Sequence, residues 1–176
     1  VASRAVTLVD DPHRPGGLAS ALFDDEGVPT RRKVMVERGV LKDYYFDASA
    51  GAREGRPSNG SASRGGVRGL PGPGPTNLIL MPGKMTREAL IAGTKDGILV
   101  FEIMGMHTAD PVSGELSVGV SGVAVRRGEI THGIKGAMLS GNIRDLFGAV
   151  DAVADDLICH GSLAAPTFRC AGMAVA

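Results

Sequence analysis

The stretch ELSVGVSGVAV, residues Glu115–Val125, alternates between branched apolar residues and small or polar ones. A period of two places the apolar side chains on one face of a β-strand. Glycine and serine occupy the other face, where they let a neighbouring backbone lie close. The following Arg126-Arg127-Gly128 is typical of a tight turn and leads into Glu129-Ile130-Thr131. The stretch therefore predicts one arm of an antiparallel hairpin.

Further hairpin and strand patterns surround this stretch. A second hairpin is predicted where Lys33–Glu37 and Val40–Phe46 flank Arg38-Gly39. Apolar runs predict strands over Ala5–Val9, Asn77–Met81, Phe168–Val175 and Ile98–Met104, the last as a central strand. Short helices are predicted over Ala48–Glu54, over Arg87–Ala92 behind an N-cap at Thr86, and over Asn142–Leu157. The expected fold class is α+β, with a curved, mainly antiparallel sheet and a few short helices.

The bulk properties exclude several classes of protein. A chain of 176 residues suits one domain with its own core. Nineteen basic and nineteen acidic residues cancel, which disfavours a dominant nucleic-acid or membrane-surface role. Two cysteines are too few for a disulfide framework, and neither a signal peptide nor a membrane-spanning apolar run is apparent. We expect a cytoplasmic protein. Because the sequence begins at Val1, directly in strand-like sequence, a fragment of a longer chain is also expected.

The segment Gly55–Pro75 differs sharply in composition from the rest of the chain. It is rich in Gly, Pro, Ser and Arg and too poor in apolar residues to order itself by burial. It is interpreted as a mobile loop or as an arm held against another part of the protein. Loops of this length inside a compact domain are often functional, although a disordered surface excursion is an equally good interpretation.

The sequence contains no complete set of catalytic residues. The four histidines are scattered, and none lies four positions from another on a predicted helix, as a zinc-protease motif requires. Cys159 and His160 are adjacent, but neighbours along a strand point to opposite faces, which disfavours a nucleophile–base pair. The small residues of Ser117–Val123 suit either the addition of an extended peptide to a strand edge or tight packing against a strand of the same fold.

Several segments, taken in order, resemble one known family. They are Gly17–Val28 (GLASALFDDEGV), Arg38–Leu41 (RGVL), Thr76–Leu78 with Pro82-Gly83, Gly105–Gly114 with Ser117, Ser140–Phe147 (SGNIRDLF) and Ala165–Phe168 (APTF). Their order and spacing resemble the C-terminal part of the TldD/TldE (PmbA) metallopeptidases, historically labelled modulators of DNA gyrase. The resemblance covers residues 1–176 and makes them the C-terminal domain of a larger protein.

The resemblance implies a cytosolic, zinc-dependent peptidase that works as a dimer, commonly a TldD–TldE heterodimer, on unfolded or leader peptides. In the family the zinc-binding His-Glu-x-x-x-His helix lies upstream of this region, on the TldD-type subunit, and this sequence contains no such motif. TldD-type subunits also supply a cysteine in a Gly-x-Cys-Gly-Lys-like setting, a pattern that Asp156–Ser162 lacks. The helix start at Gly141–Asp145 and the short run into Pro166 resemble the TldE/PmbA type.

We therefore expect a subunit that supplies dimer interface and peptide-channel wall rather than the zinc site. The expected partner is a TldD-type subunit or a second copy of the chain, with a peptide as substrate and no membrane or nucleic acid. No metal or cofactor is expected on this chain, Cys159 included, and zinc is expected on the catalytic subunit. The residues expected near the peptide are Asn77, Gly105, His107, Ser117, Gly119 and Ser121.

Two other functions remain open. The chain is alternatively a fragment of a catalytically complete TldD-like homodimer, whose zinc motif lies upstream of Val1. It is alternatively a nucleic-acid or gyrase-interacting module, as the older family label suggests; the neutral charge and the lack of a basic stripe count against that function.

Overall fold

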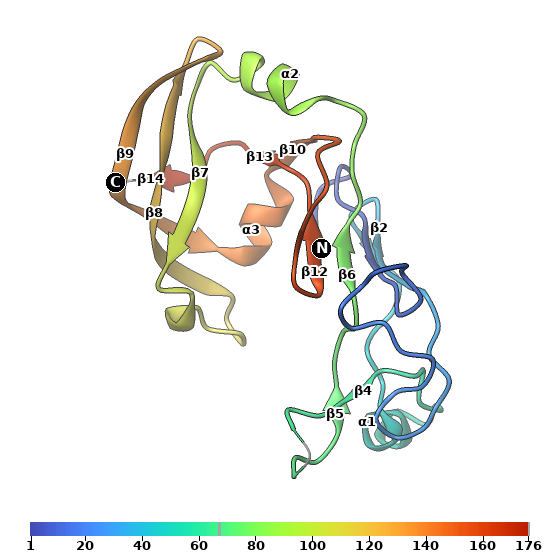
Figure 1. Ribbon diagram of the computed structural model, residues 1–176. Coiled ribbons are helices and arrows are strands. Elements are labelled where there is room, and N and C mark those ends of the chain that lie inside the picture. Colours follow the sequence, from blue (N-terminus) through green and yellow to red (C-terminus); the bar gives the residue numbers. More distant parts are fainter. Residues whose placement is uncertain (67, 176) are drawn as a thin grey trace. The chain divides into compact units, whose positions relative to one another are not determined.

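The computed structural model describes residues 1–66 and 68–175, which form two compact units built from interleaved segments (Figure 1). The first unit contains residues 1–6, 82–156 and 166–175. The second contains residues 7–81 and 157–165. Sequence composition indicated one domain, but it could not show that the chain leaves the second unit and later returns to complete its sheet.

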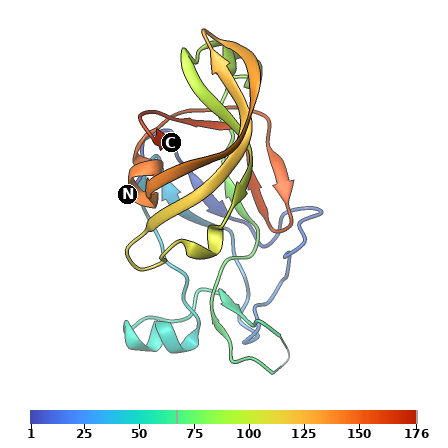
Figure 2. The same ribbon diagram turned by 90° about the vertical axis from the view of Figure 1, so that its left-hand side faces the viewer.

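The first unit is dominated by a four-stranded antiparallel sheet with the order β14-β9-β8-β7. Figure 2 shows the molecule from the side on which this sheet lies. Its strands are β7 (Asp96–Met104), β8 (Glu115–Arg126), β9 (Glu129–Asn142) and β14 (Ala174–Val175). Along β8 the side chains of Leu116, Val118 and Val120 are buried and form a core with partly buried residues, as the alternation predicts. The prediction that Ile98–Met104 is a central strand is wrong, because β7 lies at the edge of the sheet.

Both predicted hairpin turns are confirmed. Arg127 and Gly128 have φ angles of 54° and 83°, and Arg38 and Gly39 have 47° and 81°. Two successive positive φ values match the right-handed twist of the flanking strands. The second hairpin is shorter than predicted: it pairs β2 (Lys33–Glu37) with β3 (Val40–Leu41) only.

Two short helices of the first unit are α2 (Arg87–Ala92) and α3 (Ile143–Gly148). The Thr86 hydroxyl accepts a hydrogen bond from the Ala89 N–H at 3.2 Å, which confirms the predicted N-cap. The prediction of a helix from Asn142 to Leu157 is wrong beyond Gly148. Val150 and Val153 match a helical spacing, but both are β-branched, and they lie in β10 (Val150–Val153).

Strand β10 pairs with β13 (Phe168–Cys170) to form a small separate sheet. The Arg169 guanidinium makes two bonds to the Asp151 carboxylate, at 2.8 and 3.1 Å, and a third to the Gly93 carbonyl at the end of α2. The predicted strand Phe168–Val175 is therefore two strands, β13 and β14, separated at Gly172, whose φ is 72°.

The second unit contains a six-stranded sheet with the order β11-β12-β6-β1-β2-β3. Its remaining strands are β1 (Leu8–Asp10), β6 (Leu78–Leu80), β11 (Ile158–His160) and β12 (Leu163–Ala165). The pair of β12 and β6 is parallel, and the other pairs are antiparallel. The predicted helix near residue 48 is α1 (Ala48–Arg53), capped by Asp47. The α+β class with mainly antiparallel sheets is confirmed.

The Gly- and Pro-rich segment contains a two-stranded ladder of β4 (Ala62–Ser63) and β5 (Gly72–Pro73). The Asp24 carboxylate accepts from the Ala62 N–H at 3.0 Å, and the Asp25 carboxylate accepts from the Arg64 N–H at 2.7 Å. Polar contacts thus help to hold the described part of this segment, in which Ala62 is also buried. Its mobility stays a prediction.

Candidate functional site

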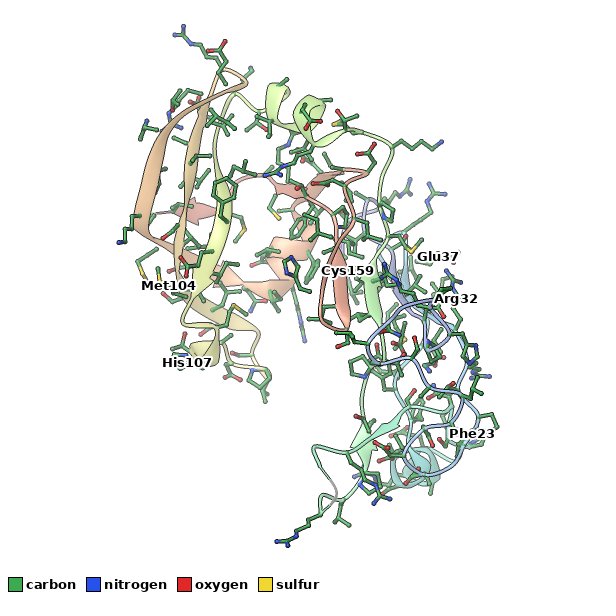
Figure 3. All side chains as sticks on the ribbon, viewed as in Figure 1. Phe23, Arg32, Glu37, Met104, His107 and Cys159 are labelled. Carbon is green, nitrogen blue, oxygen red and sulfur yellow. The ribbon has the colours of Figure 1, made fainter. Side chains whose placement is uncertain are left out.

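Five of the six predicted peptide-contacting residues lie in the first unit, around one end of the sheet. Gly105, His107 and Ser117 lie on or beside the 3₁₀ helix η1 (Met106–Thr108) and the start of β8. Gly119 and Ser121 follow on the same face of β8 as Ser117. Figure 3 labels Met104 and His107, which lie at this end of the sheet. The sixth residue, Asn77, belongs to the second unit.

The Thr108 hydroxyl joins η1 to β8. It donates to the Gly105 carbonyl at 2.8 Å and lies 3.1 Å from the Ser117 carbonyl. Beside it is an open groove of about 440 Å³, lined by Thr108, Asp110, Glu115, Leu116 and Ser117. Asp110 accepts hydrogen bonds from the Val112 N–H and from the hydroxyl and N–H of Ser113. These bonds lower the pKa of the Asp110 carboxyl, and the bond from Val112 has the largest effect. The groove therefore carries negative charge from Asp110.

The outward face of β8 is lined by small side chains. The Ser117 hydroxyl lies 3.0 Å from the Ser140 hydroxyl of β9, and Gly119 lies opposite Met104 of β7. Because β8 is paired on both sides, by β7 and β9, no peptide can add to its edges. The close backbone approach predicted for this stretch is therefore made by strands of the same sheet.

Asn77 is a structural clamp. Its side-chain oxygen accepts from the Ala19 N–H, and its side-chain nitrogen donates to the Asp11 carbonyl and the Ser20 hydroxyl, all within 3.1 Å. The residue is 2% exposed. The Asn77 amide is therefore bonded within its own chain and shielded from solvent. The structure favours this internal role over the predicted place near a substrate.

The cysteines are poor metal ligands here. The Arg14 guanidinium lies 3.1 Å from the Cys159 sulfur, and a cation at that position competes with a metal ion. Burial, with a smaller contribution from the negative charge of Asp151, raises the pKa of Cys170 to about 11, which keeps it a thiol. Within residues 1–66 and 68–175, no group of three or more His, Cys, Asp or Glu side chains could hold a metal. The described donors do not fit a zinc ion.

The outer edge of β7 is the feature that sequence reasoning missed. In the part of the chain that the structure describes, β7 pairs with β8 alone. Four of its apolar side chains are exposed: Val100 at 36%, Phe101 at 63%, Ile103 at 49% and Met104 at 42%. Phe101 lies at a register shift between Val100 and Glu102. A long apolar edge strand is typical of a surface that another chain covers.

The fold and these surfaces define a class: a β-rich domain that offers strand edges and grooves, with no metal-donor set among the residues described. The family model for the PmbA/TldA metallopeptidase C-terminal domain matches residues 1–176. This chain belongs to the PmbA/TldD metallopeptidase family.

Solved structures and curated relatives agree with this assignment. The chain is similar to TldE from Thermococcus kodakarensis, with a TM-score of 0.91, 27% identity and coverage of 99% of this chain and 40% of that one. A Thermotoga maritima protein carrying the label of a modulator of a DNA gyrase superposes with a TM-score of 0.90 and 37% identity, over 99% of this chain and 40% of that one. Metalloprotease PmbA of Escherichia coli is 28% identical over 95% of this chain and 36% of its own length.

The chain spans about a third of the length of the curated relatives it matches. Proteins named as TldD homologues match over much of the same region. None of the helices among the described residues has the length and apolar character needed to cross a membrane.

Proposed function

We propose that this domain is the binding part of a TldE/PmbA-like subunit in a zinc-dependent peptidase. It supplies dimer interface and one wall of the channel that holds an unfolded or leader peptide, in the cytoplasm. The zinc belongs to a TldD-type partner. The observation that carries the proposal is the exposed apolar edge of β7, in a domain whose described side chains offer no metal-donor set.

An edge strand suits peptides of varied sequence. Its free N–H and C=O groups bond to the backbone of an added strand, which every peptide carries, while alternate side chains meet the flanking surface. On one face of β7 the added strand would meet Ile103, and on the other Glu102 and Met104. The Met104 side chain packs over Gly119, where a Cβ atom would lie 3.5 Å from the Met104 methyl carbon.

The proposed roles of the two subunits, catalysis by the partner and peptide binding by this chain, are consistent with the chemistry of metallopeptidases. A zinc ion polarises the scissile carbonyl and activates water, with a glutamate as base. In this proposal those groups belong to the partner, and the residues of this chain orient the extended peptide. Gly105, His107, Ser117, Gly119 and Ser121 are proposed to lie near that peptide.

Replacing Ile103 by lysine in the full-length protein is expected to weaken binding of an unfolded peptide to the complex about tenfold, or ~1.4 kcal/mol. Lysine on an edge strand opposes the addition of another strand. The measurement is the dissociation constant for a fluorescent peptide. Val112→Lys is the control, because Val112 is 87% exposed in the same unit but lies outside β7. Equal affinities for the two variants would show that β7 does not form part of the channel wall.

The second candidate function is a catalytically complete TldD-like homodimer, and the matches to TldD homologues favour it. The two functions differ in the residues preceding Val1. A His-Glu-x-x-x-His motif there, together with stoichiometric zinc on the purified intact protein, would support the homodimer. Zinc on the partner alone would support the heterodimer.

The third candidate function, a nucleic-acid or gyrase-interacting module, draws on the label of the Thermotoga relative. The formal net charge of +0 disfavours it, since DNA affinity depends on clustered Lys and Arg that neutralise phosphates. Tight DNA binding that weakens steeply with added salt would favour it.

A further inference from the structure

The edge strand β7 carries two carboxylates and no basic side chain. The Asp96 carboxylate lies 3.5 Å from the guanidinium of Arg126, its partner in β8. Glu102 is opposite Ser121 instead, and none of the ion pairs among the described residues includes Glu102. Because Glu102 is also exposed, the free edge of β7 bears one negative charge without a counter-charge.

A β-bulge determines the face of the sheet on which Glu102 lies. Val100 is opposite Gly122 and Glu102 is opposite Ser121, so Phe101 is an extra residue in β7. Since consecutive residues of β8 point to opposite faces, the bulge turns Glu102 away from the face of Val100. Glu102 therefore shares the outward face of the sheet with Ser121.

Met104 lies on the same outward face as Glu102, two residues further along the strand. Its side chain packs over Gly119: a Cβ atom built there would lie 3.5 Å from the methyl carbon and 3.7 Å from the Cβ atom of Met104. Met104 nevertheless stays 42% exposed. A carboxylate and an apolar thioether side chain thus stand side by side at the free edge, about 7 Å apart along the strand.

We propose that this edge selects peptides in which a Lys or Arg side chain and a large apolar side chain are two positions apart. The inference rests on the proposed function, in which an extended peptide adds to β7. Alternate side chains of an added strand lie on one face, so one lies opposite Glu102 and the next opposite Met104. The cation neutralises the carboxylate, and the apolar side chain covers the thioether.

An edge carboxylate has a simpler role, which is to keep other strands away. Charged side chains on edge strands oppose unwanted pairing. Removing such a charge strengthens the binding of every peptide, whatever its sequence. Removing a selecting carboxylate weakens the binding of cationic peptides alone. The direction of the change in Glu102→Gln therefore separates the two roles.

The test compares two fluorescent peptides on the full-length protein in its complex, one containing Leu-x-Lys-x-Leu and the other Leu-x-Glu-x-Leu. The symmetric pattern suits an added strand of either direction. We expect the Lys peptide to bind about fivefold more tightly, a preference that shrinks with added salt. Glu102→Gln should abolish the preference, and Glu102→Lys should reverse it. Asp96→Lys makes the same change in net charge beside Arg126 and should leave the preference unchanged.

Three results would overturn the inference: equal binding of both peptides by the unaltered protein, a preference that Glu102→Lys leaves unchanged, or tighter binding of both peptides by Glu102→Gln. The proposed function survives any of these results if Ile103→Lys still weakens the binding of both peptides. If Ile103→Lys binds both peptides as tightly as the unaltered protein does, the proposed function itself is wrong.

Discussion

Replacing Lys33 by methionine is expected to lower the free energy of unfolding by about 3–5 kcal/mol. The change leaves the Asp10 carboxylate buried without its counter-charge, at 0% side-chain exposure. It also removes the donor from the Arg31 and Gly60 carbonyls. Methionine fills a similar volume, so the loss comes from the unpaired charge and not from a cavity. Urea denaturation of the full-length protein measures it, as a lower midpoint at an unchanged slope.

The matched control is Lys42→Met. Lys42 lies 3.3 Å from Glu37, closer than Lys33 lies to Asp10, but the two side chains are 47% and 56% exposed. Solvent screens such a pair, and its loss is expected to cost less than about 1 kcal/mol. If the two variants lose the same stability, burial does not determine the strength of the Asp10–Lys33 pair, and the account of the second unit is wrong.

Replacing Gly122 by alanine is expected to cost about 3 kcal/mol of stability and to displace β7 from β8. A Cβ atom at Gly122 would lie 2.0 Å from the Leu99 carbonyl oxygen and 2.9 Å from the Leu99 carbonyl carbon. These are backbone atoms of the paired strand, so no side-chain rotation relieves the clash. Because β7 carries the proposed peptide-binding edge, peptide affinity should fall together with stability.

Gly133→Ala tests the same substitution in the neighbouring strand β9. No atom lies within 4 Å of a Cβ built at Gly133. The expected change in stability is within about 0.5 kcal/mol. Hydrogen exchange of the β7 amides distinguishes the variants, since it should quicken only in Gly122→Ala. Equal exchange in both would show that the strands do not depend on this close approach.

Local patterns predicted the parts of the fold that local chemistry determines. Alternation identified β8, the Arg127-Gly128 turn supplied two positive φ angles, and Thr86 capped α2. The order of strands was not predictable in this way. An apolar run such as Ile98–Met104 suits a central strand or an edge strand that another chain covers. Likewise, the spacing of Val150 and Val153 suits either a helix or a strand.

The surroundings of Asn77 and Cys159 were less predictable because their contacts join distant parts of the sequence. Asn77 bonds to Ala19, Ser20 and Asp11, which lie 57 to 66 positions away. Arg14 reaches Cys159 across 145 positions. No residue spacing in the sequence predicts such hydrogen-bond partners. The sequence did show which motif was missing, since a His-Glu-x-x-x-His helix is recognisable in a sequence wherever it occurs.

We propose that this chain contributes binding surface to a peptidase whose zinc site lies on a related partner. The most direct measurement is peptidase activity and zinc content of the full-length protein, alone and after co-purification with a TldD-type subunit. We expect a stable complex, activity only in that complex, and zinc on the partner. A full-length protein that binds zinc and cleaves peptides alone, or that stays monomeric beside the partner and adds nothing to its activity, would contradict this role.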